Sequence, residues 1–282
     1  MYEAFIYIGS ISGIIVIANW LEQHVRPVIS EWKEKKELQN ELFEFFKQDA
    51  YCDIGVVHPY LAERKLPHPD NKKTLGKISH TIYNYFRAER EIKYAETVGH
   101  VNEKENVCSI GSPVSTGLSR KGMGYPLEGD NLGKEPNTNL PFIFNLDTKD
   151  LGEATRMLDG KRWIVKNWSI IDRNSGKEFE PQLNSDGSLK TDYLLITVMP
   201  NSLSEEGKRG NKIHGIIGGC HGTGTKAIGN VLDNVELLSD IKKGKKECDY
   251  YQSLIKISKV KHTKTDCTPV KVDHVKTIPI EV

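Results

Sequence analysis

Residues 213–227 read IHGIIGGCHGTGTKA, and this stretch decides the expected fold. Its first half is an apolar run that predicts a buried strand over residues 213–219. Its second half opens a helix, which we expect over residues 225–241. Between them, Gly222, Gly224 and Ala227 have the spacing G-x-G-x-x-[G/A] of a phosphate-binding turn. A strand that passes through such a turn into a helix is typical of an α/β domain.

The turn has the features that bind an anion. Glycines let the backbone turn tightly and bring its N–H groups close to a ligand, and the start of the helix adds a partial positive charge. We expect phosphate to be held by the residues of this turn, which are Gly219, Gly222, Thr223, Gly224 and Thr225. Conventional NAD use is not expected, because Asp240, the acid at the right distance, lies in a helical stretch. The alternative is a glycine-rich turn that only lets the helix pack on the sheet.

A second loop of similar chemistry follows the apolar run NVCSI at residues 106–110. Hydroxyl groups and a guanidinium group able to make two contacts with phosphate lie along it. The predicted ligand-binding residues of this loop are Gly111, Ser112, Ser115 and Arg120. Because ligands of open α/β sheets bind outside the carboxyl ends of strands, we expect the two loops to form two walls of one cleft for a phosphate-bearing small molecule. The alternative is a pair of unrelated surface turns.

A chemical alternative rests on residues 218–222, GGCHG, which have the form G-x-C-x-G. This form resembles the nucleophile elbow of Cys-dependent α/β hydrolases and of glutamine-amidotransferase-like domains. The resemblance implies that Cys220 is a nucleophile activated by the helix start, with a base from His262 or His274. The neighbouring His221 is a candidate ligand contact, general base or helix cap. In the structural alternative, Cys220 is a small buried thiol that packs as an apolar group.

The rest of the chain predicts a helix over residues 72–94 and a long loop over residues 111–139. A hairpin turn is expected at Asn174, Ser175 and Gly176. Further strands are expected over residues 53–58, 106–110, 140–147, 162–172, 192–200, 253–261 and 270–278. These elements predict an α/β fold class, a Rossmann-like mixed sheet with an antiparallel β insertion.

Three motifs together resemble a known family. They are IGSPVS with the following SR (residues 110–120), DYLLITVMPN (residues 192–201) and GGCHGTGT (residues 218–225). They look like an uncharacterised bacterial family of Rossmann-like, nucleotide-sensor-like domains found behind varied amino-terminal modules. The resemblance covers residues 106 to about 260. It implies a ligand-binding fold and brings no settled activity with it.

Residues 4–21 read AFIYIGSISGIIVIANWL and carry no charge. As a helix they would rise about 27 Å, close to the thickness of a bilayer core. An excess of positive charge follows the run, at Arg26, Lys33, Lys35 and Lys36. Because cytoplasmic flanks carry this excess, the pattern places the carboxyl-terminal part in the cytoplasm. The alternative is a buried first strand or helix of a soluble domain.

We therefore expect three parts: a single transmembrane anchor at residues 1–25, a juxtamembrane helix at 26–50 and a cytosolic α/β ligand-binding domain at 51–282. Gly9 and Gly13 lie four residues apart, a spacing that lets membrane helices approach closely. The expected localisation is a single-pass membrane protein, and a homo-oligomer is possible on this spacing.

Composition excludes several classes of protein. The formal net charge is +1, which excludes a basic nucleic-acid coat and an acidic disordered tail for the chain as a whole. Five cysteines, an odd number without a C-x-x-C pair, exclude a disulfide scaffold and a zinc ribbon. No H-E-x-x-H or paired-aspartate motif occurs, so no metal site is predicted.

Residues 242–276 hold ten lysines and four acidic residues. This charge suits an anionic membrane surface or anionic ligands, and the alternative is an edge strand that lysines protect from aggregation. Aromatic residues are not interleaved with the lysines, so a nucleic-acid partner is not expected.

The sequence thus favours a membrane-anchored domain that senses a nucleotide-type ligand in signalling or antiviral defence. A Cys-dependent hydrolase or nucleotide-processing enzyme is the second hypothesis, and a membrane-associated scaffold without a ligand is the third.

Overall fold

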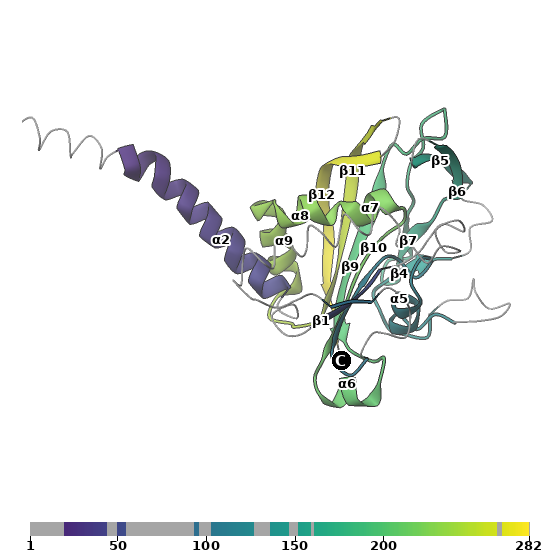
Figure 1. Ribbon diagram of the computed structural model, residues 1–282, viewed down its shortest axis with the longest axis horizontal. Coiled ribbons are helices and arrows are strands. Elements are labelled where there is room, and N and C mark those ends of the chain that lie inside the picture. Colours follow the sequence, from purple (N-terminus) through teal and green to yellow (C-terminus); the bar gives the residue numbers. More distant parts are fainter. Residues whose placement is uncertain are drawn as a thin grey trace, which may run out of the picture.

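The protein is built around one twisted sheet with helices on one face and a smaller sheet on the other (Figure 1). The computed structural model describes residues 20–43, 50–54, 93–95, 103–126, 136–146, 152–158, 161–263 and 267–281. Within the predicted ligand-binding domain, two predictions fall largely outside these residues. They are the helix over residues 72–94, of which only 93 and 94 are described, as strand, and the first predicted strand, of which residues 55–58 are not described.

The central sheet has seven strands in the order β12-β11-β9-β10-β3-β1-β2. Their bounds are β1 (Ala50–Ile54), β2 (Lys93–Ala95), β3 (Asn106–Ile110), β9 (Asp192–Pro200), β10 (Ile213–Gly219), β11 (Tyr251–His262) and β12 (Cys267–Pro279). Strands β2, β1, β3 and β10 are parallel, whereas β9, β11 and β12 pair antiparallel with their neighbours. The predicted α/β class with a mixed sheet is confirmed.

An antiparallel insertion lies between β3 and β9 in the sequence, as predicted. Strands β4 (Phe142–Asn145), β7 (Ser169–Asp172) and β8 (Lys177–Phe179) form a three-stranded sheet, and β5 (Glu153–Leu158) pairs with β6 (Lys161–Lys166). The single strand predicted over residues 162–172 is wrong, because the chain breaks at Asn167 between β6 and β7. The Asn167 side chain binds the Pro181 carbonyl oxygen at 3.2 Å, and such local bonds compete with a strand ladder.

The helices are shorter than the sequence predicted. They are the π-helical turn η1 (Leu21–Val25), α2 (Arg26–Leu42), α5 (Gly117–Gly122), α6 (Glu205–Arg209), α7 (Gly222–Lys226), α8 (Ile228–Leu232) and α9 (Val235–Lys245). The single helix predicted over residues 225–241 is wrong, because Asn234 starts a new helix by accepting a hydrogen bond from Leu237 N at 3.0 Å. The predicted loop over residues 111–139 contains α5, which Thr116 caps through Ser119 N at 2.9 Å.

The central sheet has a hydrophobic core on each face, and strand β9 contributes side chains to both. Alternate side chains of a strand point to opposite faces, and nearly all of β9 is buried. Leu194, Ile196 and Val198 pack with the helices α7 to α9, whereas Tyr193 and Leu195 pack with the small sheet. The uninterrupted apolar run that predicted β9 is therefore explained by burial on both faces.

The buried amide of Gln252 joins the two sheets. Its oxygen accepts from Phe142 N at 2.6 Å, and its nitrogen donates to the Phe142 carbonyl oxygen at 3.0 Å. The same nitrogen donates to Thr197 Oγ1 at 3.0 Å, within the central sheet. Because every polar atom of this buried amide is bonded, Gln252 fixes β4 over β11 without an unpaired group.

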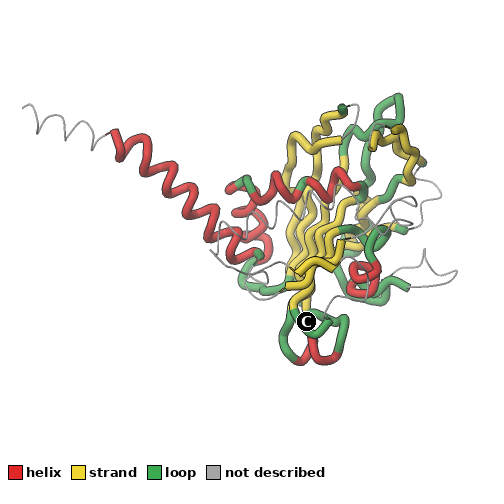
Figure 2. The backbone as a smooth tube through the Cα atoms, in the orientation of Figure 1, coloured by secondary structure: helices red, strands yellow, loops and turns green. Residues whose placement is uncertain are grey.

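Helix α2 docks on the domain mainly by its carboxyl-terminal part. Leu38 and Leu42 are buried there, and the Tyr251 hydroxyl donates to the Leu42 carbonyl oxygen at 2.9 Å. Glu41 adds an ion pair with Lys242 at 2.6 Å. The rest of α2 and η1 projects away from the sheet as an exposed rod (Figure 2).

Part of the predicted anchor and juxtamembrane helix is described. Residues 26–42 are helical as expected, and residues 44–49 lie outside the described part. The predicted membrane span lies almost wholly in residues 1–19, which also fall outside it. Among the helices that are described, none has the length and apolar character needed to cross a membrane.

His214 on β10 gives the domain an expected acid sensitivity. It is fully buried with Nε2 2.8 Å from Ser109 Oγ, and burial lowers its pKa from 6.5 to about 3. Between these values the unfolded chain binds more protons than the folded one, so stability falls as the pH falls below 6.5. From pH 6.5 to pH 4.5 we expect a loss of about 2 kcal/mol from this group.

Urea unfolding of the full chain at the two pH values measures this loss. The variant His214→Gln keeps a hydrogen-bonding side chain without a titrating ring, so its stability is expected to change less over the same interval. The exposed His24→Gln serves as the control and should keep the wild-type dependence. An unchanged pH dependence in His214→Gln would contradict the assignment.

Candidate functional site

The two loops predicted to bind a ligand lie at the same edge of the sheet. Strands β3 and β10 are parallel neighbours, and Gly111 N donates to the Ile217 carbonyl oxygen at 2.8 Å just beyond the paired residues. The loops are also in direct contact. A Cβ atom on Gly218 would lie 2.8 Å from Ser112 Cα, so only glycine permits this approach.

The polar groups of the first loop hold the loop's own shape. The Ser112 carbonyl oxygen accepts from Ser115 N at 2.8 Å and from Ser115 Oγ at 3.0 Å. The Ser119 hydroxyl donates to the Gly111 carbonyl oxygen at 2.8 Å. Ser112 is buried, whereas Ser115 and Arg120 are half-buried. Burial lowers the pKa of the Arg120 guanidinium, and Tyr125 offsets part of that change.

The glycine-rich turn is filled by a carboxylate of the chain itself. Gly224 N donates to Asp192 Oδ2 at 2.6 Å, and Tyr193 N donates to Asp192 Oδ1 at 2.8 Å. Gly219 N donates to Thr225 Oγ1 at 3.0 Å. Asp192, which is completely buried, therefore bonds the backbone where an anionic ligand was expected. These contacts are those of the structural alternative, a turn that packs its short helix on the sheet.

Two of the predicted ligand residues in the turn differ in exposure. Gly222 is half-buried, whereas Thr223 is fully buried. Among the described residues the Thr223 hydroxyl has no hydrogen-bond partner. Helix α7 spans only five residues, so its amino terminus offers a weak dipole to a ligand.

The environment of Cys220 does not favour a nucleophile. Its side chain is buried, and burial, aided by the nearby Asp192 carboxylate, raises the pKa of the thiol well above its ordinary value. A reactive cysteine needs the opposite shift. The bases proposed for it are engaged elsewhere, His262 with Cys267 Sγ at 3.3 Å and His274 with Thr277 Oγ1 at 2.8 Å.

His221 points from the turn to the insertion. Its Nε2 lies 2.8 Å from Asn167 Oδ1, at the break between β6 and β7. Asn167 in turn donates to the Pro181 carbonyl oxygen, so one amide links the glycine turn to the segment after β8. Through its side chain, His221 thus contacts Asn167, which lines the cavity described next.

A cavity of about 840 Å³ opens beside this contact. The cavity lies at the same rim of the sheet as the two loops. Its lining residues Tyr193 and Lys256 pair across β9 and β11, and the residue after Tyr193, Leu194, pairs with Gly219 at the carboxyl end of β10. Its lining comes from the insertion and from β9, β11 and β12: Asn167, Lys177, Glu178, Phe179, Glu180, Pro181, Gln182, Leu183, Lys190, Tyr193, Lys256 and Val275.

The chemistry of this cavity suits an anion that carries a flat ring. Lys177, Lys190 and Lys256 supply positive charge, against the two carboxylates of the lining. Phe179 and Tyr193 meet edge to face, with their ring centroids 5.7 Å apart. The Lys177 ammonium lies 4.9 Å from the centroid of the Phe179 ring, a cation–π distance. Burial, with smaller effects from Cys220 and Asp192, raises the pKa of the Tyr193 hydroxyl, so it remains a neutral donor.

Sequence reasoning missed this cavity because its charges come from separate elements. Lys177 lies on β8, Lys190 lies just before β9 and Lys256 lies on β11. No short motif connects them. The one available signal was the position of Asp192 and Tyr193 at the start of an otherwise apolar strand.

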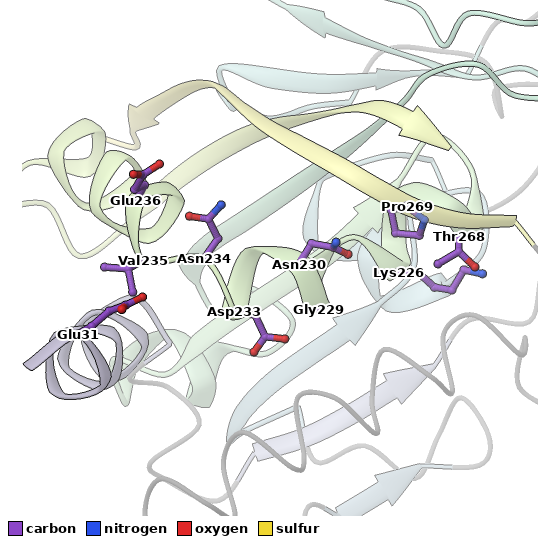
Figure 3. A pocket seen from close by; sticks show the side chains of 10 residues that line it. All are labelled: Glu31, Lys226, Gly229, Asn230, Asp233, Asn234, Val235, Glu236, Thr268 and Pro269. Carbon is purple, nitrogen blue, oxygen red and sulfur yellow. The ribbon is translucent and has the colours of Figure 1, made fainter. Parts of the chain in front are cut away.

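A second cavity, of about 650 Å³, lies on the helix face of the sheet (Figure 3). Glu31, Asp233 and Glu236 contribute three carboxylates, whereas Lys226 is the single cation of its lining. Lys226 also donates to the Cys267 carbonyl oxygen. This balance of charge repels a phosphate, so the cavity beside His221 is the better anion site.

Fold and cavity together define a mixed α/β domain with a basic, aromatic-lined cavity at one rim of its sheet. Comparison of the chain with family models, with curated proteins and with solved structures finds no match. Among the described residues no cluster of three or more potential metal ligands occurs.

Proposed function

We propose that this chain is a Rossmann-like ligand-binding protein that recognises a phosphate-bearing, nucleotide-type molecule and acts in signalling or defence. The observation that carries the proposal is the cavity with Lys177, Lys190 and Lys256 at the rim where β10 ends. Ligands of open α/β sheets bind at this rim. The parallel strands β2, β1, β3 and β10 support the Rossmann-like part of the proposal.

The ligand is proposed to bind in the cavity and not in the glycine turn itself. Asp192 already bonds the Gly224 amide, so the turn has a supporting role. It positions His221, which holds Asn167 at the cavity wall. Phosphate then meets the lysines, and a base or similar ring meets Phe179 and Tyr193.

The output of such a sensor passes through α2. This helix is joined to the ligand-binding domain by Leu38, Leu42 and the Glu41 ion pairs, and it extends well beyond the domain (Figure 1). We propose that the uncharged residues 4–21 anchor it in a membrane, with the domain in the cytoplasm. This part of the proposal rests on sequence alone.

Thermal unfolding of the full chain in mild detergent, with a panel of mono-, di- and cyclic nucleotides, tests the ligand class. Binding to the folded state at one hundred times Kd stabilises by about 2.7 kcal/mol, so at least one nucleotide is expected to raise Tm by several degrees. Inorganic pyrophosphate, which lacks a ring, should give a smaller shift. The proposal fails if no member of the panel raises Tm.

Substitution of single lysines tests whether the ligand binds in the cavity. Lys256→Gln removes a cavity charge and should reduce the Tm shift, because the ligand loses one phosphate contact. Lys259→Gln removes an exposed lysine of the same strand that does not line the cavity, so the shift should persist. Equal shifts in the two variants would place the ligand elsewhere.

A further inference from the structure

The projecting part of α2 and η1 exposes an apolar stripe. We define the α2 stripe as Leu21, Val25, Val28 and Trp32, which follow one another at intervals of four, three and four residues. In the protomer Leu21 is 45% exposed, Val28 64% and Trp32 50%, whereas Val25 is half-buried. An exposed apolar row of this kind on a helix marks a surface that another molecule covers.

The spacing of the stripe is that of a coiled-coil seam. Alternating steps of three and four residues bring apolar side chains to the two core positions of the heptad. Leu21 and Val28 take one of these positions, and Val25 and Trp32 take the other. Between Leu21 and Val25 the chain forms a π-helical turn, which keeps residues four apart on the same side of the helix.

The residues outside the stripe narrow the choice of partner. Ser30, Lys33, Glu34 and Glu37 are exposed polar residues of the opposite side, and charged residues also flank the stripe. Ile29, which is 48% exposed, adds one apolar side chain beside Val28. Because the other flanking residues are polar or charged, the apolar row is still narrower than the broad face that a helix lying on a membrane surface needs.

The domain does not cover the stripe. Glu31 points toward α9 and lines the second cavity with Val235 and Glu236 (Figure 3). Leu38 and Leu42 continue that contact further along the helix. Leu42 lies two heptads after Val28, so the stripe is on the same side of the helix as this contact. It is exposed because the helix projects past the end of the domain there (Figure 2), which leaves room for a second helix along the projecting part.

Charges beside the stripe fit a parallel pair of helices. Glu31 lies just before the core residue Trp32, and Lys36 lies just after Lys35, which takes the next core position of the heptad. In a parallel dimer each Glu31 therefore faces Lys36 of the other copy. Lys36 lies at the edge of the seam in the protomer, with its ammonium 3.8 Å from the centroid of the Trp32 ring. Opposite charges at these flanking positions favour the pairing and fix its orientation.

We propose that the α2 stripe is the interface of a parallel homodimer in which two copies of this chain pair through Leu21, Val25, Val28 and Trp32. The described seam covers about two heptads, and short helical pairs are marginally stable. The dimer is therefore weak and reversible, which suits an element whose pairing is regulated. The inference does not depend on the ligand or on its cavity.

Disulfide trapping in the full chain tests the geometry. Val28→Cys places a thiol in the seam and Ser30→Cys places one on the opposite, exposed side of the same helix. After mild copper-catalysed oxidation in detergent, Val28→Cys is expected to give several-fold more disulfide-linked dimer than Ser30→Cys, with the unsubstituted chain as background. Equal yields, or no dimer from Val28→Cys, would overturn the proposal. The Leu21→Cys and Trp32→Cys chains can also be mixed and oxidised. A disulfide between these two variants would show an antiparallel pair and would also overturn the proposal.

Sedimentation equilibrium gives an independent measure. In the dimer, Val28→Glu would place four negative charges near the seam, because each copy would contribute Glu31 and a new carboxylate at position 28. Their repulsion should raise the dimer Kd at least tenfold. Ser30→Glu should leave the Kd unchanged. Since both side chains are exposed in the protomer, neither variant should alter the Tm of the domain or its shift by nucleotides. A blue shift of tryptophan fluorescence with lipid vesicles, without any change in association, would instead assign the stripe to a membrane.

Discussion

Asp192→Ala is expected to cost about 3 kcal/mol of folding free energy, one of the two largest losses expected of any single substitution considered for this domain. The substitution removes both acceptor oxygens that bind Gly224 N and Tyr193 N, at 2.6 and 2.8 Å. The two donors remain buried, and each unsatisfied buried donor costs about 1–3 kcal/mol. Chemical denaturation of the full chain measures the change.

The control is Asp186→Ala. Asp186 also accepts from a backbone amide and a hydroxyl, both of Ser188, but it lies in an exposed turn where water replaces the lost bonds. Its removal should change stability far less. Asp192→Asn, which keeps one acceptor oxygen, should fall between the two. If Asp192→Ala is as stable as the wild type, the carboxylate does not support the turn.

The Asp192→Ala variant also distinguishes two interpretations of the glycine turn. In the view taken from the sequence, Gly219, Gly222, Thr223, Gly224 and Thr225 bind phosphate directly. In the structure the Asp192 carboxylate supplies the negative charge that binds the turn, and the turn stabilises the wall of the cavity. Nucleotide binding should therefore weaken in Asp192→Ala through displacement of Tyr193, and adding free phosphate should not restore stability.

Three strands of the central sheet could be predicted with their bounds from the sequence because they are buried. The runs at residues 106–110, 192–200 and 213–219 are strands β3, β9 and β10 with those bounds. Each is apolar along its length and is ended by Gly or Pro, or by a turn, so burial and local chemistry agree. The location of both loops at one rim followed from these strands.

The contacts of the site could not be predicted in the same way. Asp192 and Gly224 lie 32 residues apart, and Asn167 and His221 lie 54 apart, so neither pair has a local pattern. The G-x-G-x-x-A spacing is satisfied equally by a ligand and by an internal carboxylate, because both supply an anion to the same amides. The helix break at Asn234 was missed for a different reason, since its cap is a local signal that the apolar period obscures.

Gly224→Ala is expected to cost about 3 kcal/mol, because the position has no room for a methyl group. A Cβ atom there would overlap the Tyr193 carbonyl oxygen and lie 2.9 Å from Gly219 Cα. Both are backbone groups and cannot move aside as a side chain would. Since the Tyr193 carbonyl oxygen also accepts from Cys220 N at 3.0 Å, the clash spreads to the cavity wall.

Gly117→Ala is the matched control for this substitution. Gly117 opens helix α5, and a Cβ atom there would meet nothing within 4 Å. Because alanine favours a helix over glycine, this variant should be as stable as the wild type or slightly more stable, by about 0.5 kcal/mol. Urea unfolding and nucleotide-induced Tm shifts are measured for both variants. A Gly224→Ala chain that keeps both stability and ligand response would show that close packing of the turn on β9 does not shape the cavity, and the site would then have to be sought away from this rim.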